Sequence, residues 1–124
     1  MTMETSMSIN QGEIWMVEFF PKVGSEITKL RPAIVVSHNE IGRLPLKTIV
    51  PITDWKNNYV HYPWMLKIEV NALNGLSKTS AIDCFQVKNF SNKRFVKRVG
   101  EVDEMIIKKV HETIVKTLNP AYVL

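Results

Sequence analysis

The sequence predicts a mainly β domain with one long helix near its C-terminal end, forming a small, strongly bent sheet or barrel that the helix caps. Short runs rich in β-branched and aromatic residues, separated by turn-forming residues, recur between residues 13 and 90, which is typical of short strands. One amphipathic pattern at helical spacing follows them, formed by Val102, Ile106, Val110, Ile114 and Leu118.

Three strands are expected in the first half of the chain. Residues 13–20 consist mostly of β-formers and scarcely alternate, which indicates a well-buried strand. Residues 32–37 form a second apolar run, which Pro32 opens at the position where its missing N–H does least harm. Residues 47–53 form a third, and Pro51 within it indicates a sheet edge or a bulge.

Two further strands and the helix are expected in the second half. Residues 64–70 and 81–90 alternate between apolar and polar side chains, as half-buried strands do. Asp103 lies in the first turn of the expected helix and Lys116 in its last, which suits the helix dipole. Asn119, followed by a proline, ends it.

Length and composition predict one domain. The chain has 124 residues, of which 45% are hydrophobic and 23% charged, which is ordinary globular usage. Residues 1–11 are polar and without periodicity, so we expect a flexible arm before a single domain of residues 12–124.

The sequence contains no run of 18 apolar residues, so no membrane contact is expected. Cys84 is the lone cysteine, which favours a reducing, cytoplasmic setting. A domain this small gains from covering by a second copy, so we expect a homodimer.

The charge is mildly basic and unevenly distributed. Sixteen Lys and Arg against twelve Asp and Glu give a net charge of +4. Residues 84–100 contain five cations and no carboxylate, namely Lys88, Lys93, Arg94, Lys97 and Arg98. Such a stretch either tracks a phosphate backbone or forms a solvated face, and charge alone leaves both interpretations open.

Several common catalytic motifs are absent from the sequence. Its five glycines are isolated, so there is no phosphate-binding glycine loop. His38, His61 and His111 have no Cys or carboxylate at ligand spacing, so neither a metal nor a cofactor is expected. Cys84 lies in an alternating strand and is expected to be a small core residue.

One pair of residues is placed where chemistry is possible. Arg31 directly precedes a buried strand, and Thr53 closes another. If these strands are neighbours, a guanidinium and a hydroxyl meet at one end of the sheet. The structural alternative is that Arg31 forms a salt bridge, for example to Glu26, and that Thr53 caps a turn.

A series of short motifs in a fixed order carries a family resemblance. The motifs are Gly12-Glu13-Ile14-Trp15, Gly24-Ser25-Glu26, Arg31-Pro32-Ala33-Ile34-Val35-Val36-Ser37, Asn39-Glu40-Ile41-Gly42 and Pro51-Ile52-Thr53. With weaker matches later in the chain, the sequence resembles the MazF/PemK toxins of bacterial toxin–antitoxin modules over residues 12–118. The resemblance implies a compact SH3-like barrel of the CcdB/MazF type with short helices and a long C-terminal helix. It also implies a homodimeric, sequence-specific endoribonuclease that acts on single-stranded RNA without a metal ion and is neutralised by a small acidic antitoxin.

The resemblance also implies functional residues. Arg31 and Thr53 correspond to the family's catalytic pair, and Glu26 to a glutamate that is important in some relatives. Further positions are expected to contact RNA, through stacking, base edges or phosphates: Ser25, Ser37, Asn39, Trp55, Lys56, Asn57, Lys78, Gln86 and Lys88.

Two other functions fit the same fold class. A CcdB-like toxin acts on DNA gyrase and cleaves no RNA, and an SH3-like binding module has no catalytic residues. Both alternatives predict that Arg31 and Thr53 are dispensable.

Overall fold

The computed structural model describes residues 8–19, 29–41 and 45–119. Within these residues the chain forms seven strands, three short 3-10 helices and one α-helix. The strands are β1 (Glu13–Glu18), β2 (Leu30–Val35), β3 (Leu46–Asp54), β4 (Met65–Ile68), β5 (Ser80–Asp83), β6 (Lys88–Ser91) and β7 (Phe95–Glu101). The helices are η1 (Asn39–Ile41), η2 (Asn57–His61), η3 (Asn92–Arg94) and α1 (Glu104–Leu118).

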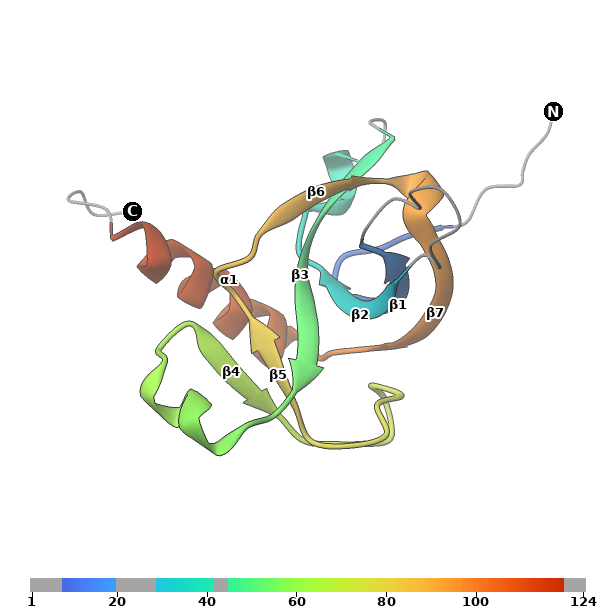
Figure 1. Cartoon of the computed structure of the whole chain (residues 1–124). Helices are drawn as coiled ribbons and strands as arrows, with labels where there is room; N and C mark the ends of the chain where they lie inside the picture. The colour runs from blue at the N-terminus through green and yellow to red at the C-terminus, as the bar shows by residue number, and fades with distance from the viewer. Residues whose placement is uncertain (1–7, 20–28, 42–44, 120–124) are drawn as a thin grey trace, which may run out of the picture.

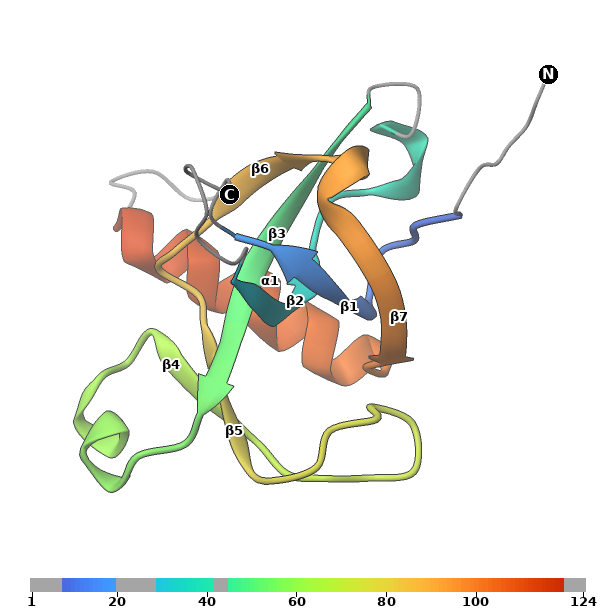
Figure 2. The same ribbon diagram turned by 45° about the vertical axis from the view of Figure 1, so that its right-hand side comes forward.

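All seven strands belong to one antiparallel sheet with the order β4-β5-β3-β2-β1-β7, and β6 pairs with β3 outside this path. The long strand β3 joins the two halves of the sheet, because it pairs with β6 through Leu46–Ile49 and with β5 through Ile52–Asp54 (Figure 1). From β6 the chain returns through η3 to β7, which pairs with β1 and completes a curl beside β3 (Figure 2).

The expected barrel is therefore not confirmed. Among the described strands β6 and β7 are joined by η3 and share no ladder, so the sheet is strongly bent and stays open. A side chain helps to hold the curl together, because Nη1 of Arg94 donates to the carbonyl oxygens of Glu18 and Phe19 at 2.9 and 3.1 Å. This part of the basic stretch thus has a structural role.

The two faces of the sheet are both apolar. Ile34, Ile52 and Ile82 share one face, where α1 packs through Val110. The alternate residues of the same strands point to the other face and fill a second core inside the curl, together with Phe95. They include Trp15, Val17, Ala33, Val35 and Ile49. Successive residues of a strand point to opposite faces, so a strand covered on both sides reads as a continuous apolar run. This confirms the buried strands expected near residues 13–20 and 32–37.

The predicted helix is confirmed. Asp103 caps its N-terminus, with its Oδ1 accepting from the backbone N–H of Ile106 at 2.9 Å. Asn119 ends it in the left-handed conformation at φ 45°. The helix α1 falls short of the length and apolarity that crossing a bilayer requires.

Three expectations need correction. The strand that contains Pro51 is central. Pro51 is opposite Ala33 of β2 on one side, and proline is tolerated because the other side of β3 is unpaired there, between the end of its β6 ladder and the start of its β5 ladder. The single strand expected at residues 81–90 is two strands, because Oδ1 of Asp83 accepts from the N–H of Phe85 and turns the chain. The expected arm also ends earlier than residue 11, since Ile9 is buried in the second core.

Candidate active site

The expected pair lies on adjacent strands. In the β2–β3 ladder Ala33 is opposite Pro51, and continuing this antiparallel register by two residues brings Arg31 opposite Thr53. Residues two apart in a strand share a face, and Ala33 belongs to the second core. Arg31 and Thr53 therefore lie on the same face as that core, next to its apolar residues. The two strands are thus neighbours, which is the condition under which the guanidinium and the hydroxyl were expected to meet at one end of the sheet.

Two hollows adjoin this pair, and Arg31 and Thr53 line both of them. The first, which we call the Asp83 hollow, has a volume of about 360 Å³. Its other lining residues are Phe19, Pro51, Tyr59, Met65, Asp83, Gln86 and Lys88. The second, the Lys78 hollow, has a volume of about 380 Å³ and extends toward Gly75, Ser77 and Lys78. The pair thus stands where two adjoining depressions meet.

One nitrogen of the Arg31 guanidinium lacks a hydrogen-bond partner. Its Nε is buried and has no hydrogen-bond partner among the described residues. A buried donor without a partner costs about 1–3 kcal/mol, and native structures leave few of them. A cation with an open donor at the junction of two hollows is suited to binding an anion.

Three predicted RNA contacts also line these hollows. Lys88 begins β6 and Gln86 precedes it, and both lie in the Asp83 hollow. Lys78 lines the other hollow, where its Nζ is 3.0 Å from Oδ2 of Asp54 in an exposed ion pair. Each hollow is therefore lined by a lysine in addition to Arg31.

The loop after β3 carries three more of the predicted RNA contacts, Trp55, Lys56 and Asn57. Trp55 packs edge-on against Tyr59 with ring centroids 5.8 Å apart, and Nζ of Lys67 lies 5.3 Å from the Trp55 ring centroid. Tyr59 lines the Asp83 hollow, whereas Lys56 and Asn57 are exposed at the start of η2. The loop thus places aromatic surface beside the site.

The structure does not bring Ser37 and Asn39 to the pair, because they follow the opposite end of β2. Oγ of Ser37 accepts from the N–H of Thr48 at 3.1 Å. Oδ1 of Asn39 accepts from the N–H of Gln11 at 2.7 Å. Ser25 and Glu26 lie outside the described residues.

Sequence reasoning missed Asp83, a residue at the end of β5 that is 6% exposed. The signal was a carboxylate in an otherwise apolar strand, where only the apolar positions were interpreted. Its neighbour Cys84 is fully buried, and burial together with the Asp83 carboxylate raises the pKa of the Cys84 thiol to about 12. A thiol with so high a pKa is not a nucleophile at neutral pH, which agrees with the core role expected for it.

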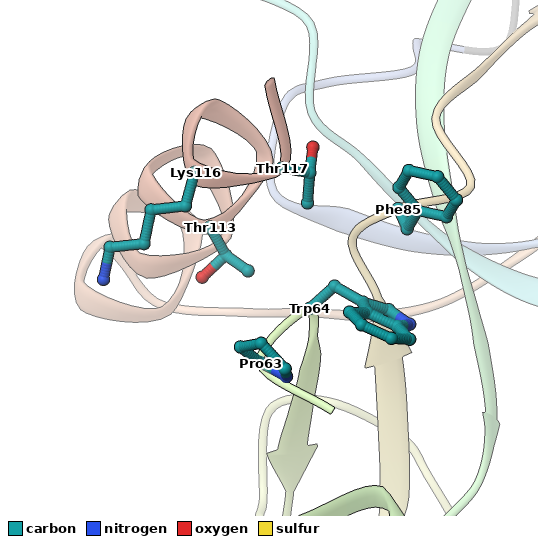
Figure 3. A pocket seen from close by; sticks show the side chains of 6 residues that line it. All are labelled: Pro63, Trp64, Phe85, Thr113, Lys116 and Thr117. Atoms are coloured by element: carbon teal, nitrogen blue, oxygen red, sulfur yellow. The ribbon is translucent and has the colours of Figure 1, made fainter. Parts of the chain in front are cut away.

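A third hollow of about 390 Å³ lies between α1 and the start of β4, away from the pair. Figure 3 shows Trp64 and Phe85 facing Thr113 and Thr117 of the helix across it. It contains no carboxylate, and none of the predicted site residues lines it. Elsewhere in the described part of the chain, no three His, Cys, Asp or Glu side chains are grouped as metal ligands would be.

Comparisons with known proteins give the family. Residues 10–118 match the model of the PemK-like, MazF-like toxins of type II toxin–antitoxin systems. The endoribonuclease MazF9 of Mycobacterium tuberculosis is 26% identical over 112 residues, covering 86% of this chain and 92% of the relative. The endoribonuclease PemK of Escherichia coli is 29% identical over 106 residues, covering 82% and 76%.

The fold is shared with solved structures. MazF from Deinococcus radiodurans, in a structure with MazE, superposes with a TM-score of 0.73 at 19% identity and covers 94% of this chain and 100% of that one. An endoribonuclease from a mycobacterial species in complex with its cognate antitoxin gives a TM-score of 0.69 at 14% identity, over 92% and 98% of the two chains. Because the matched segment spans nearly every described residue, the chain belongs to the PemK-like, MazF-like toxin family of type II toxin–antitoxin systems.

Proposed function

We propose that this protein is a toxin endoribonuclease that cleaves single-stranded RNA at specific sequences, with Arg31 and Thr53 acting on one phosphodiester. The observation that carries the proposal is that the two residues lie on the neighbouring strands β2 and β3 and that both line each of the two adjoining hollows. An extended strand of nucleotides occupies one hollow on each side of a phosphate held between the two residues. The curated relatives, which are named endoribonucleases, support the same activity.

The proposed chemistry uses the nucleophile that RNA itself carries. The 2′-oxygen attacks the adjacent phosphorus and forms a new P–O bond, while the bond to the 5′-oxygen breaks. The 2′-OH loses one proton and the departing 5′-oxygen takes one up, so the products are a 2′,3′-cyclic phosphate and a free 5′-OH, and no water or metal-bound hydroxide is consumed. A 2′-deoxy strand cannot react by this route.

Each residue of the pair has a distinct role in this step. Negative charge gathers on the non-bridging oxygens in the transition state, and Arg31 offers them a fixed set of donors that stays charged at neutral pH. Its unpartnered Nε then gains an acceptor. Thr53 orients the 2′-OH or a phosphate oxygen by hydrogen bonding. Glu26 stays a candidate for the group that accepts the 2′-OH proton.

The partners follow from the same site. Unpaired RNA is required because bases must be splayed to be read on their edges, and Trp55 and Tyr59 provide stacking surface. An acidic segment of a separate antitoxin, folding as it binds, occupies the RNA path and blocks cleavage. The expected homodimer stays a prediction, which light scattering on the purified protein tests.

The test is incubation of the purified protein with single-stranded RNA in the presence of EDTA. We expect cleavage at a restricted set of sequences, with cyclic-phosphate and 5′-OH ends, and its loss in Arg31→Ala. RNA that stays intact across a pool of random sequence contradicts the proposal. Inhibition of DNA gyrase that survives Arg31→Ala supports the CcdB-like alternative.

A further inference from the structure

A carboxylate that the proposed cleavage step does not use lies in the wall of the Asp83 hollow. Asp83 is the last residue of β5, which pairs with β3 so that Ala81 is opposite Thr53. Asp83 is two residues further along, on the same face as Ala81, Thr53 and Arg31. The residue is 6% exposed and lines the hollow, and it lies across the β4–β5 ladder from Met65.

The carboxylate is held in one orientation by two neutral donors. Its Oδ1 accepts from the backbone N–H of Phe85 at 3.1 Å, and its Oδ2 accepts from Nε2 of Gln86 at 2.8 Å. A carboxylate offers about four acceptor sites, so each oxygen retains one. Nε2 of Gln86 likewise retains a second N–H beside them.

No cation among the described residues forms an ion pair with this group, since no Lys, Arg or His nitrogen there lies within 4.0 Å of it, although Arg31 and Lys88 line the same hollow. A desolvated carboxylate without a cationic partner binds N–H donors strongly and rejects acceptors. The wall of the hollow thus contains an N–H donor of Gln86 next to the two acceptor oxygens of Asp83.

The register places Asp83 beside the reacting phosphate rather than on it. Asp83 is a diagonal neighbour of Thr53 across the ladder, and such neighbours are about 7–8 Å apart. A general base must come within about 2.6–3.2 Å of the atom whose proton it takes. The short Asp side chain is therefore better placed to contact the base of a flanking nucleotide than the 2′-OH held by Thr53.

We propose that the Asp83 hollow is a nucleobase site and that Asp83, with Gln86, selects guanine next to the cleaved bond. The Watson–Crick edge of guanine carries O6, N1–H and N2–H in sequence, which complements one donor next to two acceptors. Adenine and cytosine each place a ring-nitrogen acceptor beside their amino group, and uracil flanks its one N–H with two carbonyl oxygens. Each of those bases turns at least one lone pair toward the carboxylate. Tyr59 and Met65 offer the base apolar surface in the same hollow.

This inference rests on the proposed nuclease function, and the first experiment uses cleavage. Wild-type protein, Asp83→Asn and Glu112→Gln are incubated with an RNA pool of random sequence, and the released 5′-OH ends are sequenced. Asp83→Asn preserves the turn-forming oxygen and the size of the side chain but replaces an acceptor with a donor. Glu112→Gln makes the same change of charge on the exposed surface of α1, away from the hollows.

We expect wild-type protein and Glu112→Gln to require guanine at one position flanking the cut, by about 5- to 150-fold over each other base. Asp83→Asn loses this requirement while cleavage at other sequences persists. Inosine, which lacks the 2-amino group, is cleaved more slowly than guanosine at that position by wild type and equally by Asp83→Asn. Wild-type cleavage without a guanine preference overturns the proposal. So does a uniform loss of rate on every sequence in Asp83→Asn, which would assign Asp83 to proton transfer instead.

A binding measurement separates this inference from the proposed function. Short 2′-O-methyl oligonucleotides, which cannot be cleaved, are titrated against the same three proteins, with guanosine or inosine as the single purine in a pyrimidine strand. Weaker binding of the inosine strand, in wild type but not in Asp83→Asn, supports the base site even if no RNA is cleaved. Equal binding of both strands by wild type contradicts it even if Arg31-dependent cleavage is found.

Discussion

The two ends of β2 differ in how their polar groups are satisfied. At the end that follows Val35, the carbonyl oxygen of Val36 lies 2.9 Å from Nε2 of Gln11 and 2.9 Å from Nε2 of His111. Oδ1 of Asn39 accepts from the N–H of Gln11 at 2.7 Å. At the other end, Nε of Arg31 is buried without a partner beside two hollows. One six-residue strand thus joins a closed network to an open site.

This difference assigns stability to one end and activity to the other. A satisfied polar network contributes to folding, and removing one of its members leaves its partner without a hydrogen bond. An unsatisfied cation contributes little to folding and is available to a ligand. Substitutions at the open end are therefore expected to change RNA cleavage, and substitutions at the closed end to change stability.

The largest expected effect is on catalysis at the open end. Arg31→Ala should lower the rate of RNA cleavage about 100- to 1000-fold, as losing one preorganised donor to a transition-state anion does. The melting temperature should stay unchanged or rise, since a partly unsatisfied group is removed. Single-turnover cleavage and thermal unfolding measure the two effects.

The matched control is Arg98→Ala at the closed end. Arg98 is exposed and pairs with Glu13 and Glu101 at 3.1 and 2.6 Å. We expect it to lose at most about 1 kcal/mol of stability, as exposed pairs do, and to keep full cleavage. Equal losses of cleavage in the two variants would show that overall positive charge, rather than the position of Arg31, matters.

A smaller effect is expected on stability at the closed end. Asn39→Ala removes the acceptor of the Gln11 N–H and should lower the free energy of unfolding by about 0.5–1.5 kcal/mol. Cleavage of a good substrate should be unchanged at a temperature where both proteins are folded. Denaturant unfolding gives the first quantity. A loss of RNA binding with unchanged stability would instead place Asn39 in the RNA path.

The smallest expected effect is a pH dependence at Glu13. Burial acts to raise its pKa, but hydrogen bonds from the Asn10 N–H, the Trp15 indole and Arg98 outweigh burial, so that the pKa lies below its ordinary value of 4.5. The stabilisation is therefore present above pH 4.5 and is lost as the pH falls through the lowered value.

Unfolding of wild type and Glu13→Gln between pH 7 and 3 tests this sign. The stability advantage of wild type should shrink steadily below about pH 4.5. An advantage that grows on acidification would contradict the assignment of these hydrogen bonds to the charged form. Cleavage at neutral pH should not differ between the two proteins.

Much of the fold was predictable because local patterns and tertiary structure agree in it. The helix was given by its apolar spacing and by Asp103, and the central strands by apolar runs that both cores cover. The strand β7 was not predicted, since its sequence is polar and its pairing with β1 is interrupted by register shifts. The sequence pattern also could not predict that the sheet stays open, because closure of a barrel depends on which strands pair.

The site was predictable only in part. Arg31 and Thr53 follow from their places at strand ends and from the family resemblance. Asn39 also belongs to a motif that the family shares, yet its Oδ1 is hydrogen-bonded to the backbone N–H of Gln11, far from Arg31 and Thr53. Asp83 was missed because its role depends on the β3–β5 register, which no single strand reveals.

The central claim is that Arg31 and Thr53 act on the same phosphodiester, and a double-mutant cycle tests it most directly. Cleavage rates of one RNA substrate are measured for wild type, Arg31→Ala, Thr53→Val and the double variant. We predict non-additive losses, with a coupling energy of about 0.5–3 kcal/mol, because groups that share a partner do not act independently. Losses that multiply as independent factors, or a Thr53→Val variant as active as wild type, would contradict the account.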